Sequence, residues 1–157
     1  MMLCLAANGA VAGSTMLKCE LKAPNEAKLG GHVSLNFKLT NTGDKPLKVL
    51  KWNTPLEEGW FGSSFNVTRN GDWVNYTGAM VKRFRPSDAD YIAIAPGKSV
   101  ENAVDLAIGY DLKKSGNYKF VFNGRVQDVQ AVAKDEEVAP SRNMYKLACD
   151  EFSIALK

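Results

Sequence analysis

Histidine is almost absent from this sequence. A single histidine, His32, occurs among 157 residues. A zinc-peptidase helix of the form His-Glu-x-x-His needs two histidines, so this chain cannot carry one. A serine triad also needs a histidine base beside its nucleophile, whereas His32 opens an alternating segment and no Gly-x-Ser-x-Gly turn occurs. We therefore predict that the chain is not an enzyme and binds no metal or cofactor.

Long apolar runs and clusters of basic residues are also missing. No apolar stretch approaches the roughly 20 residues that span a bilayer. The net charge is +3, and the 20 lysines and arginines are spread along the chain, which does not favour nucleic-acid binding. With 45% hydrophobic residues, a chain of this length suits one domain with its own core. We expect neither nucleic acid nor membrane as a partner.

The first residues are small and uncharged, and they end in Ala10-Val-Ala12. This ending fits a signal-peptidase site, although the preceding apolar part is short and has no basic residue. We predict a signal peptide, minimal or truncated, over residues 1–12 and a single mature domain over 13–157. The protein would then be secreted or periplasmic. The alternative is an ordinary N-terminal strand or tail.

Three cysteines occur in the sequence. Cys4 lies inside the predicted signal peptide, which leaves Cys19 and Cys149 near the two ends of the mature domain. An even pair in an exported domain favours a disulfide between the first and last strands, and closing so long a loop would contribute about 4 to 5 kcal/mol. Two buried free thiols are the alternative.

Short alternating segments separated by turn residues run along the whole chain. In residues 32–40, Val33, Leu35, Phe37 and Leu39 share one face. No helical periodicity lasts longer than two turns. The spacing predicts an all-β, immunoglobulin-like antiparallel β-sandwich of about 7–9 strands, with Phe37 and Trp52 in the centre of the core. The expected strands are 15–22, 32–40, 47–52, 63–69, 72–76, 91–95, 98–106, 118–127 and 151–156, with 80–85 as a candidate edge strand.

Two local patterns refine this prediction. The spacing Asp111-x4-Gly116-x-Tyr118-x-Phe120 is that of a tyrosine corner, in which the tyrosine hydroxyl bonds to the backbone of the preceding loop. Phe120 then stands where immunoglobulin domains have a cysteine. Residues 127–149 form a long polar stretch, for which we expect a solvated excursion, with a contact loop as the alternative.

Aromatic residues are concentrated between Trp52 and Tyr76. A loop that carries Trp60 and Phe61 lies between two glycines, and exposed aromatic residues beside basic ones are favoured at protein interfaces. The alternative is that Trp52 and Trp73 are core residues while Trp60 and Phe61 cap one end of the sandwich. The candidate binding residues are Trp60, Phe61, Tyr76, Lys82 and Arg83.

Three segments resemble a known family. They are Leu50-Lys-Trp-Asn-Thr-Pro-Leu56, Tyr76-Thr-Gly-Ala-Met-Val-Lys-Arg83, and Val104-Asp-Leu106 leading to Tyr110-Asp111. Together they resemble the propeptide-type β-domain that precedes the zinc domain in deuterolysin and peptidyl-Lys metallopeptidases. The resemblance covers about residues 29–122 and the final strand, and implies help with folding or restraint of an enzyme. The zinc ligands and catalytic glutamate of that family have no counterpart here.

These observations lead to one expected function and two alternatives. We expect a secreted, non-catalytic protein-binding domain that acts as an inhibitor or folding helper of a secreted metallopeptidase. The first alternative is a carbohydrate- or surface-binding adhesion module that uses the aromatic loop. A remnant enzyme is the second.

Overall fold

The computed structural model describes residues 16–59 and 62–157. This part of the chain consists of β-strands, two short 3-10 helices and no α-helix, which confirms the all-β prediction. None of its helices has the length and apolar character needed to cross a membrane. The predicted signal peptide, Cys4, Trp60 and Phe61 lie outside the described residues.

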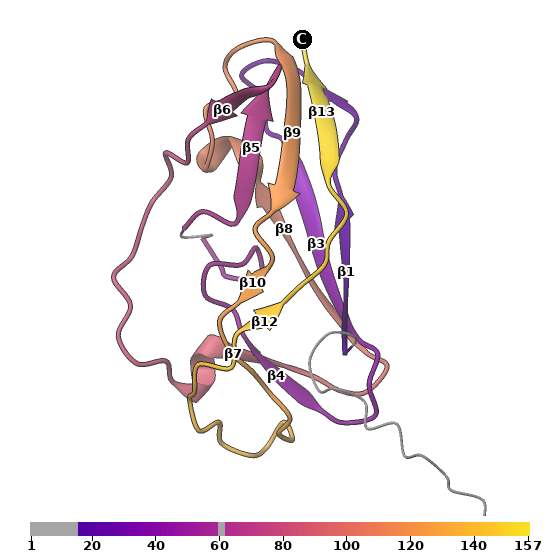
Figure 1. Cartoon of the computed structure of the whole chain (residues 1–157), viewed down its shortest axis with the longest axis vertical. Helices are drawn as coiled ribbons and strands as arrows, with labels where there is room; N and C mark the ends of the chain where they lie inside the picture. The colour runs from indigo at the N-terminus through magenta and orange to yellow at the C-terminus, as the bar shows by residue number, and fades with distance from the viewer. Residues whose placement is uncertain (1–15, 60–61) are drawn as a thin grey trace, which may run out of the picture.

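The described strands divide into longer and very short ones. Nine have three or more residues: β1 (Leu17–Lys22), β3 (Ser34–Asn41), β4 (Leu47–Leu50), β5 (Phe65–Arg69), β6 (Asp72–Val74), β7 (Tyr91–Ile94), β8 (Ser99–Asp105), β9 (Gly116–Phe122) and β13 (Phe152–Leu156). Four have two residues: β2 (Glu26–Ala27), β10 (Arg125–Val126), β11 (Val129–Gln130) and β12 (Tyr145–Lys146). The 3-10 helices are η1 (Asp88–Asp90) and η2 (Leu106–Ile108). The candidate edge strand at 80–85 is instead an extended segment outside the sheets that runs along one side of the molecule (Figure 1).

The main strands form two sheets. One has the order β1-β3-β8 and the other the order β2-β13-β9-β5-β6. The pairing of β2 with β13 is parallel, and the other pairs in both sheets are antiparallel. The positions of β1, β3 and β8 in one layer and of β13, β9 and β5 in the other match those of an immunoglobulin-like sandwich. Smaller sheets, β11-β4-β7 and β10-β12, extend one end.

Aromatic rings fill the space between the two layers. Phe37 of β3 packs against Phe122 of β9, with ring centroids 5.6 Å apart, and Phe37 is fully buried as predicted. Trp52 is also buried, but it belongs to a second cluster with Leu50, Tyr91 and Val138, because β4 and β7 extend beyond the main sandwich.

Trp73 is not a core residue. Its side chain is 73% exposed. It lies on β6, which forms the edge of the five-stranded sheet and pairs only with β5. The core interpretation of Trp73 is therefore wrong.

The tyrosine corner is present. The Tyr118 hydroxyl donates a hydrogen bond to the Lys114 carbonyl oxygen at 2.7 Å. Burial of the ring raises the pKa of Tyr118, so the phenol remains the donor. This contact fixes the loop that leads into β9.

The polar stretch 127–149 is held against the protein by buried charges. The carboxylate of Asp128, which is fully buried, accepts hydrogen bonds from the Tyr91 hydroxyl at 2.5 Å and the Ser141 N–H at 3.0 Å. The Lys48 ammonium pairs with Asp88 at 2.8 Å and donates to the Glu136 carbonyl oxygen. The expected solvated excursion is confirmed in part, because residues 134–137 and 141–144 are exposed. The stretch also supplies hydrogen-bond partners for the buried Asp128 and Lys48.

Cys19 and Cys149 are joined. Cys19 on β1 and Cys149, which precedes β13, form a disulfide across a sequence separation of 130 residues. The predicted disulfide is confirmed. It links one sheet to the chain segment that enters the other.

Removal of this disulfide is expected to destabilise the domain. The double variant Cys19→Ala/Cys149→Ala should lose about 2 to 5 kcal/mol of unfolding free energy, because its unfolded chain is no longer restricted by a long covalent loop. Urea unfolding followed by tryptophan fluorescence measures the loss. The parent protein unfolded with a reducing agent, which breaks the same bond without any substitution, is the control and should show the same loss. An unchanged midpoint in the double variant would contradict this account.

Candidate functional site

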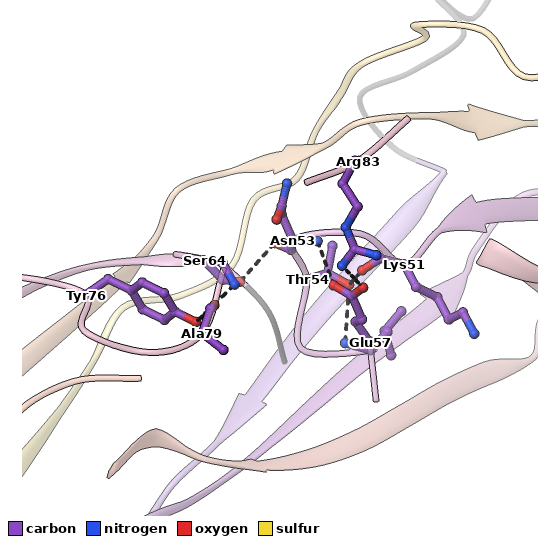
Figure 2. Close-up of polar contacts among 10 residues, drawn as sticks. Lys51, Asn53, Thr54, Glu57, Ser64, Tyr76, Ala79 and Arg83 are labelled. Carbon is purple, nitrogen blue, oxygen red and sulfur yellow. Dashed lines mark hydrogen bonds and ion pairs between the residues drawn. The ribbon is translucent and has the colours of Figure 1, made fainter. Parts of the chain in front are cut away.

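The first two segments that carry the family resemblance contact each other. The guanidinium of Arg83 donates a hydrogen bond to the Glu57 carboxylate and lies 5.0 Å from the centre of the Trp52 ring. Figure 2 shows Arg83 pointing at Glu57 from the extended segment that follows β6. Both side chains are shielded, with exposed fractions of 25% for Arg83 and 10% for Glu57. A charge pair of this kind holds the extended segment that follows β6 to the loop that contains Glu57.

The loop that starts at Lys51 is held from within by hydrogen bonds (Figure 2). The Lys51 carbonyl oxygen accepts from the Thr54 hydroxyl at 2.7 Å, and the same hydroxyl accepts from the Leu56 N–H at 3.2 Å. The second carboxylate oxygen of Glu57 accepts from the Asn53 N–H at 3.2 Å. Asn53 has a φ of 57°, a conformation that asparagine tolerates better than most residues.

Tyr76 holds the end of this loop at Gly62 through hydrogen bonds of its hydroxyl. Its hydroxyl accepts a hydrogen bond from the Gly62 N–H at 3.0 Å and donates to the Ala79 carbonyl oxygen at 2.7 Å. A Cβ on Gly62 would lie 2.3 Å from the Asn53 amide oxygen, and the φ of Gly62 is 107°. Only glycine fits this close approach.

The Tyr76 ring rests on a second tyrosine. It packs edge-on against Tyr110 with centroids 5.6 Å apart. The Tyr110 hydroxyl donates to the Phe65 carbonyl oxygen at 2.8 Å, and burial raises the pKa of Tyr110. Through these two rings the loop is connected to the start of β5. We call the contacts of Trp52, Asn53, Glu57, Tyr76 and Arg83 the loop network.

The predicted binding residues fall into three groups. Tyr76 and Arg83 lie together in the loop network, where both are only partly exposed. Lys82 is exposed and forms no ion pair with any described residue. Trp60 and Phe61 lie outside the described residues. A role of these five residues in partner binding stays a prediction.

The structure adds exposed apolar residues that the sequence analysis did not select. Phe84 is 91% exposed, Met80 81% and Met144 60%. Met80, Lys82 and Phe84 alternate along the extended segment after Tyr76. That alternation is the available signal in the sequence, but it predicts an edge strand, which does not form.

A groove lies next to the loop network. It has a volume of about 500 Å³ and is lined by Asn53, Gly62, Met80, Arg125, Arg142 and Met144 among others. These residues come from the loop, from the extended segment, from β10 and from the stretch before β12. Residues so distant in the sequence could not be grouped from the sequence alone. The described lining combines two arginines and two methionines with amide side chains and the Ser63 hydroxyl.

His32 lies away from this groove. Its Nδ1 is 2.6 Å from a carboxylate oxygen of Asp105, and the side chain is 95% exposed. Burial raises the pKa of Asp105, but hydrogen bonds from His32 and from the N–H groups of Val33 and Ala107 outweigh it and lower the pKa overall. Among residues 16–59 and 62–157, no group of three or more histidine, cysteine or acidic side chains could hold a metal ion.

Comparison with known proteins finds similarity to parts of proteases. The chain is 34% identical over 123 residues to an extracellular protease of Aeromonas hydrophila, covering 77% of this chain and 35% of that protein. It is 31% identical over 118 residues to a neutral protease 2 homologue of Arthroderma gypseum, covering 73% and 30% respectively. A probable neutral protease 2 homologue A of Trichophyton rubrum is 33% identical over 115 residues, covering 71% and 30%.

Comparisons with family models and with solved structures give weaker similarity. No family model matches the chain. The CARDB domain of a Pyrococcus furiosus protein superposes with a TM-score of 0.37 and 12% sequence identity, covering 90% of this chain and 87% of that domain. The chain is thus similar to about a third of the length of the proteases that it matches.

Proposed function

We propose that this chain is an exported, non-catalytic domain that binds a secreted metallopeptidase and acts as its inhibitor or folding helper. One observation carries the proposal. The chain is similar to about a third of the length of an extracellular protease and of neutral protease 2 homologues, yet its single histidine leaves no residues for a His-Glu-x-x-His zinc site. The Cys19–Cys149 disulfide agrees with export.

The extended segment after Tyr76 suits such a contact. Met80 and Phe84 expose apolar side chains, and exposed Lys82 lies between them. Arg83, whose guanidinium binds Glu57, keeps the segment in place. A segment held rigidly before binding loses little conformational entropy when a partner docks. Inhibition would then be steric, with the sandwich end covering the substrate cleft and no chemistry required.

Mixing the domain with a deuterolysin-type zinc peptidase tests the proposal. Hydrolysis of a casein substrate should slow in proportion to added domain, and a complex should elute earlier on gel filtration. A folding helper should instead raise the yield of active peptidase on refolding from urea. An equal concentration of albumin is the control. Unchanged hydrolysis, refolding yield and elution together would exclude both roles.

Lys82 and Arg83 should behave differently when each is replaced by glutamine. Lys82→Gln should weaken the complex without changing unfolding, because the exposed ammonium supports no other part of the fold. Arg83→Gln should lower the unfolding free energy by about 1 to 3 kcal/mol, because it leaves the shielded Glu57 carboxylate without its cation. Urea unfolding and titration with the peptidase separate the two effects. A parent-like unfolding midpoint for Arg83→Gln would contradict the role of the loop network.

A carbohydrate-binding module is the second candidate, and the exposed indole of Trp73 favours it. This side chain lies beside a hollow of about 380 Å³ whose lining includes Asp72, Asn75 and Asp111. A flat apolar ring next to amide and carboxylate groups can stack on a sugar ring and accept bonds from its hydroxyls.

A glycan array tests this second candidate. The parent domain should retain particular glycans, and Trp73→Ala should lose them because the stacking surface is gone. Trp60→Ala tests the aromatic loop in the same assay. If Trp60→Ala alone abolishes retention, the sugar site lies at the loop rather than at β6. An array on which the parent domain retains nothing excludes the module.

A further inference from the structure

The groove beside the loop network contains two cations that the protein does not use. Arg125 and Arg142 line it, and neither forms an ion pair with a described residue. Among residues 16–59 and 62–157, no aspartate or glutamate lines the groove. Guanidinium groups bind carboxylates through paired hydrogen bonds. The groove is therefore complementary to an acidic ligand.

Apolar surface accompanies these cations. Met80 and Met144 line the same groove and are largely exposed. Methionine side chains are unbranched and polarisable, so they adapt to apolar groups of different shape. A simple inorganic anion would use only the arginines, whereas a ligand that also contacts the methionines must carry apolar groups.

The surface continues beyond the groove. A smaller hollow of about 280 Å³ is lined by Phe84, Arg85, Pro86, Pro140, Ser141 and Arg142. Arg142 belongs to both hollows. The two hollows therefore adjoin at Arg142, and a ligand that occupies both must be more extended than one that fills the groove alone.

The walls of the groove are fixed before any ligand binds. Arg142 follows Ser141, whose N–H and hydroxyl both donate to the buried Asp128 carboxylate, at 3.0 and 3.3 Å. Near Arg125, the Asn123 amide donates to the Ser63 carbonyl oxygen at 2.9 Å. Both arginines therefore lie next to anchored backbone, which reduces the entropy lost on binding.

We propose that this groove binds an extended acidic segment of a protein, in which carboxylates alternate with apolar side chains. The carboxylates pair with Arg125 and Arg142, and the apolar side chains contact Met80 and Met144. The identity of the partner rests on the proposed function, in which the segment belongs to the peptidase. The chemistry of the groove does not depend on that identity.

Peptide binding without any peptidase tests the groove directly. The probe is a fluorescein-labelled octapeptide of alternating glutamate and leucine, and its counterpart has glutamine in place of glutamate. Fluorescence anisotropy should show binding of the acidic peptide that weakens as salt is added. Arg125→Gln/Arg142→Gln should weaken binding at least about tenfold. Lys113→Gln/Lys114→Gln removes the same charge outside the groove and should leave binding unchanged.

Several results would overturn the inference. They are equal binding of the glutamine peptide, equal loss in the two double variants, or no binding of the acidic peptide. A heparin hexasaccharide that binds to the parent domain and not to Arg125→Gln/Arg142→Gln, while the peptide does not bind, would assign the groove to an anionic glycan instead. If the arginine variant loses the peptide but still inhibits the peptidase, the groove is a peptide site and the proposed function holds through another surface.

Discussion

The fold depends on the burial of aromatic rings between two antiparallel sheets. Phe65 of β5 and Phe120 of β9 meet edge to face at 6.1 Å, and Phe120 stacks on Phe152 of β13 at 5.0 Å. These contacts join β5, β9 and β13 within one layer. The contact between Phe37 and Phe122 then connects that layer to β3 of the other layer. Burial of large apolar side chains is the dominant favourable contribution to folding. The loops that form the candidate site are attached to this frame and cannot form without it.

Buried charges then determine the course of the long connections. Asp128 holds the stretch that ends at Ser141, and Glu57 holds Arg83 and the backbone of Asn53. A buried carboxylate is costly unless donors surround it, so each one forces nearby backbone into a particular position. The Tyr118 hydroxyl, a neutral group, also fixes backbone in place through its hydrogen bond to the Lys114 carbonyl oxygen. As a result, the irregular segments that carry Met80, Phe84 and Arg142 are each anchored to the fold at a neighbouring residue.

The groove beside the loop network combines several kinds of side chain. The described residues that line it are two arginines, two methionines, three amide side chains, Gly62 and Ser63. The chain is similar to about a third of the length of several proteases, and the peptidase-binding role that we propose for it would need a recognition face. Free arginines and adaptable methionines provide charge selectivity and apolar contact together.

The sequence by itself determined most of the longer strands, the sandwich class, the tyrosine corner and the Cys19–Cys149 pair, because each depends on local periodicity, on turn residues or on the number of available partners. It also determined that a histidine-based zinc site is impossible. Only the tertiary structure decided that Trp52 lies in a side cluster, that Trp73 faces solvent and that Arg83 binds Glu57. It alone brought Met80, Arg125, Arg142 and Met144 to one groove. Side-chain exposure and contacts between distant segments depend on how the two layers pack. The order of residues along the sequence does not specify that packing.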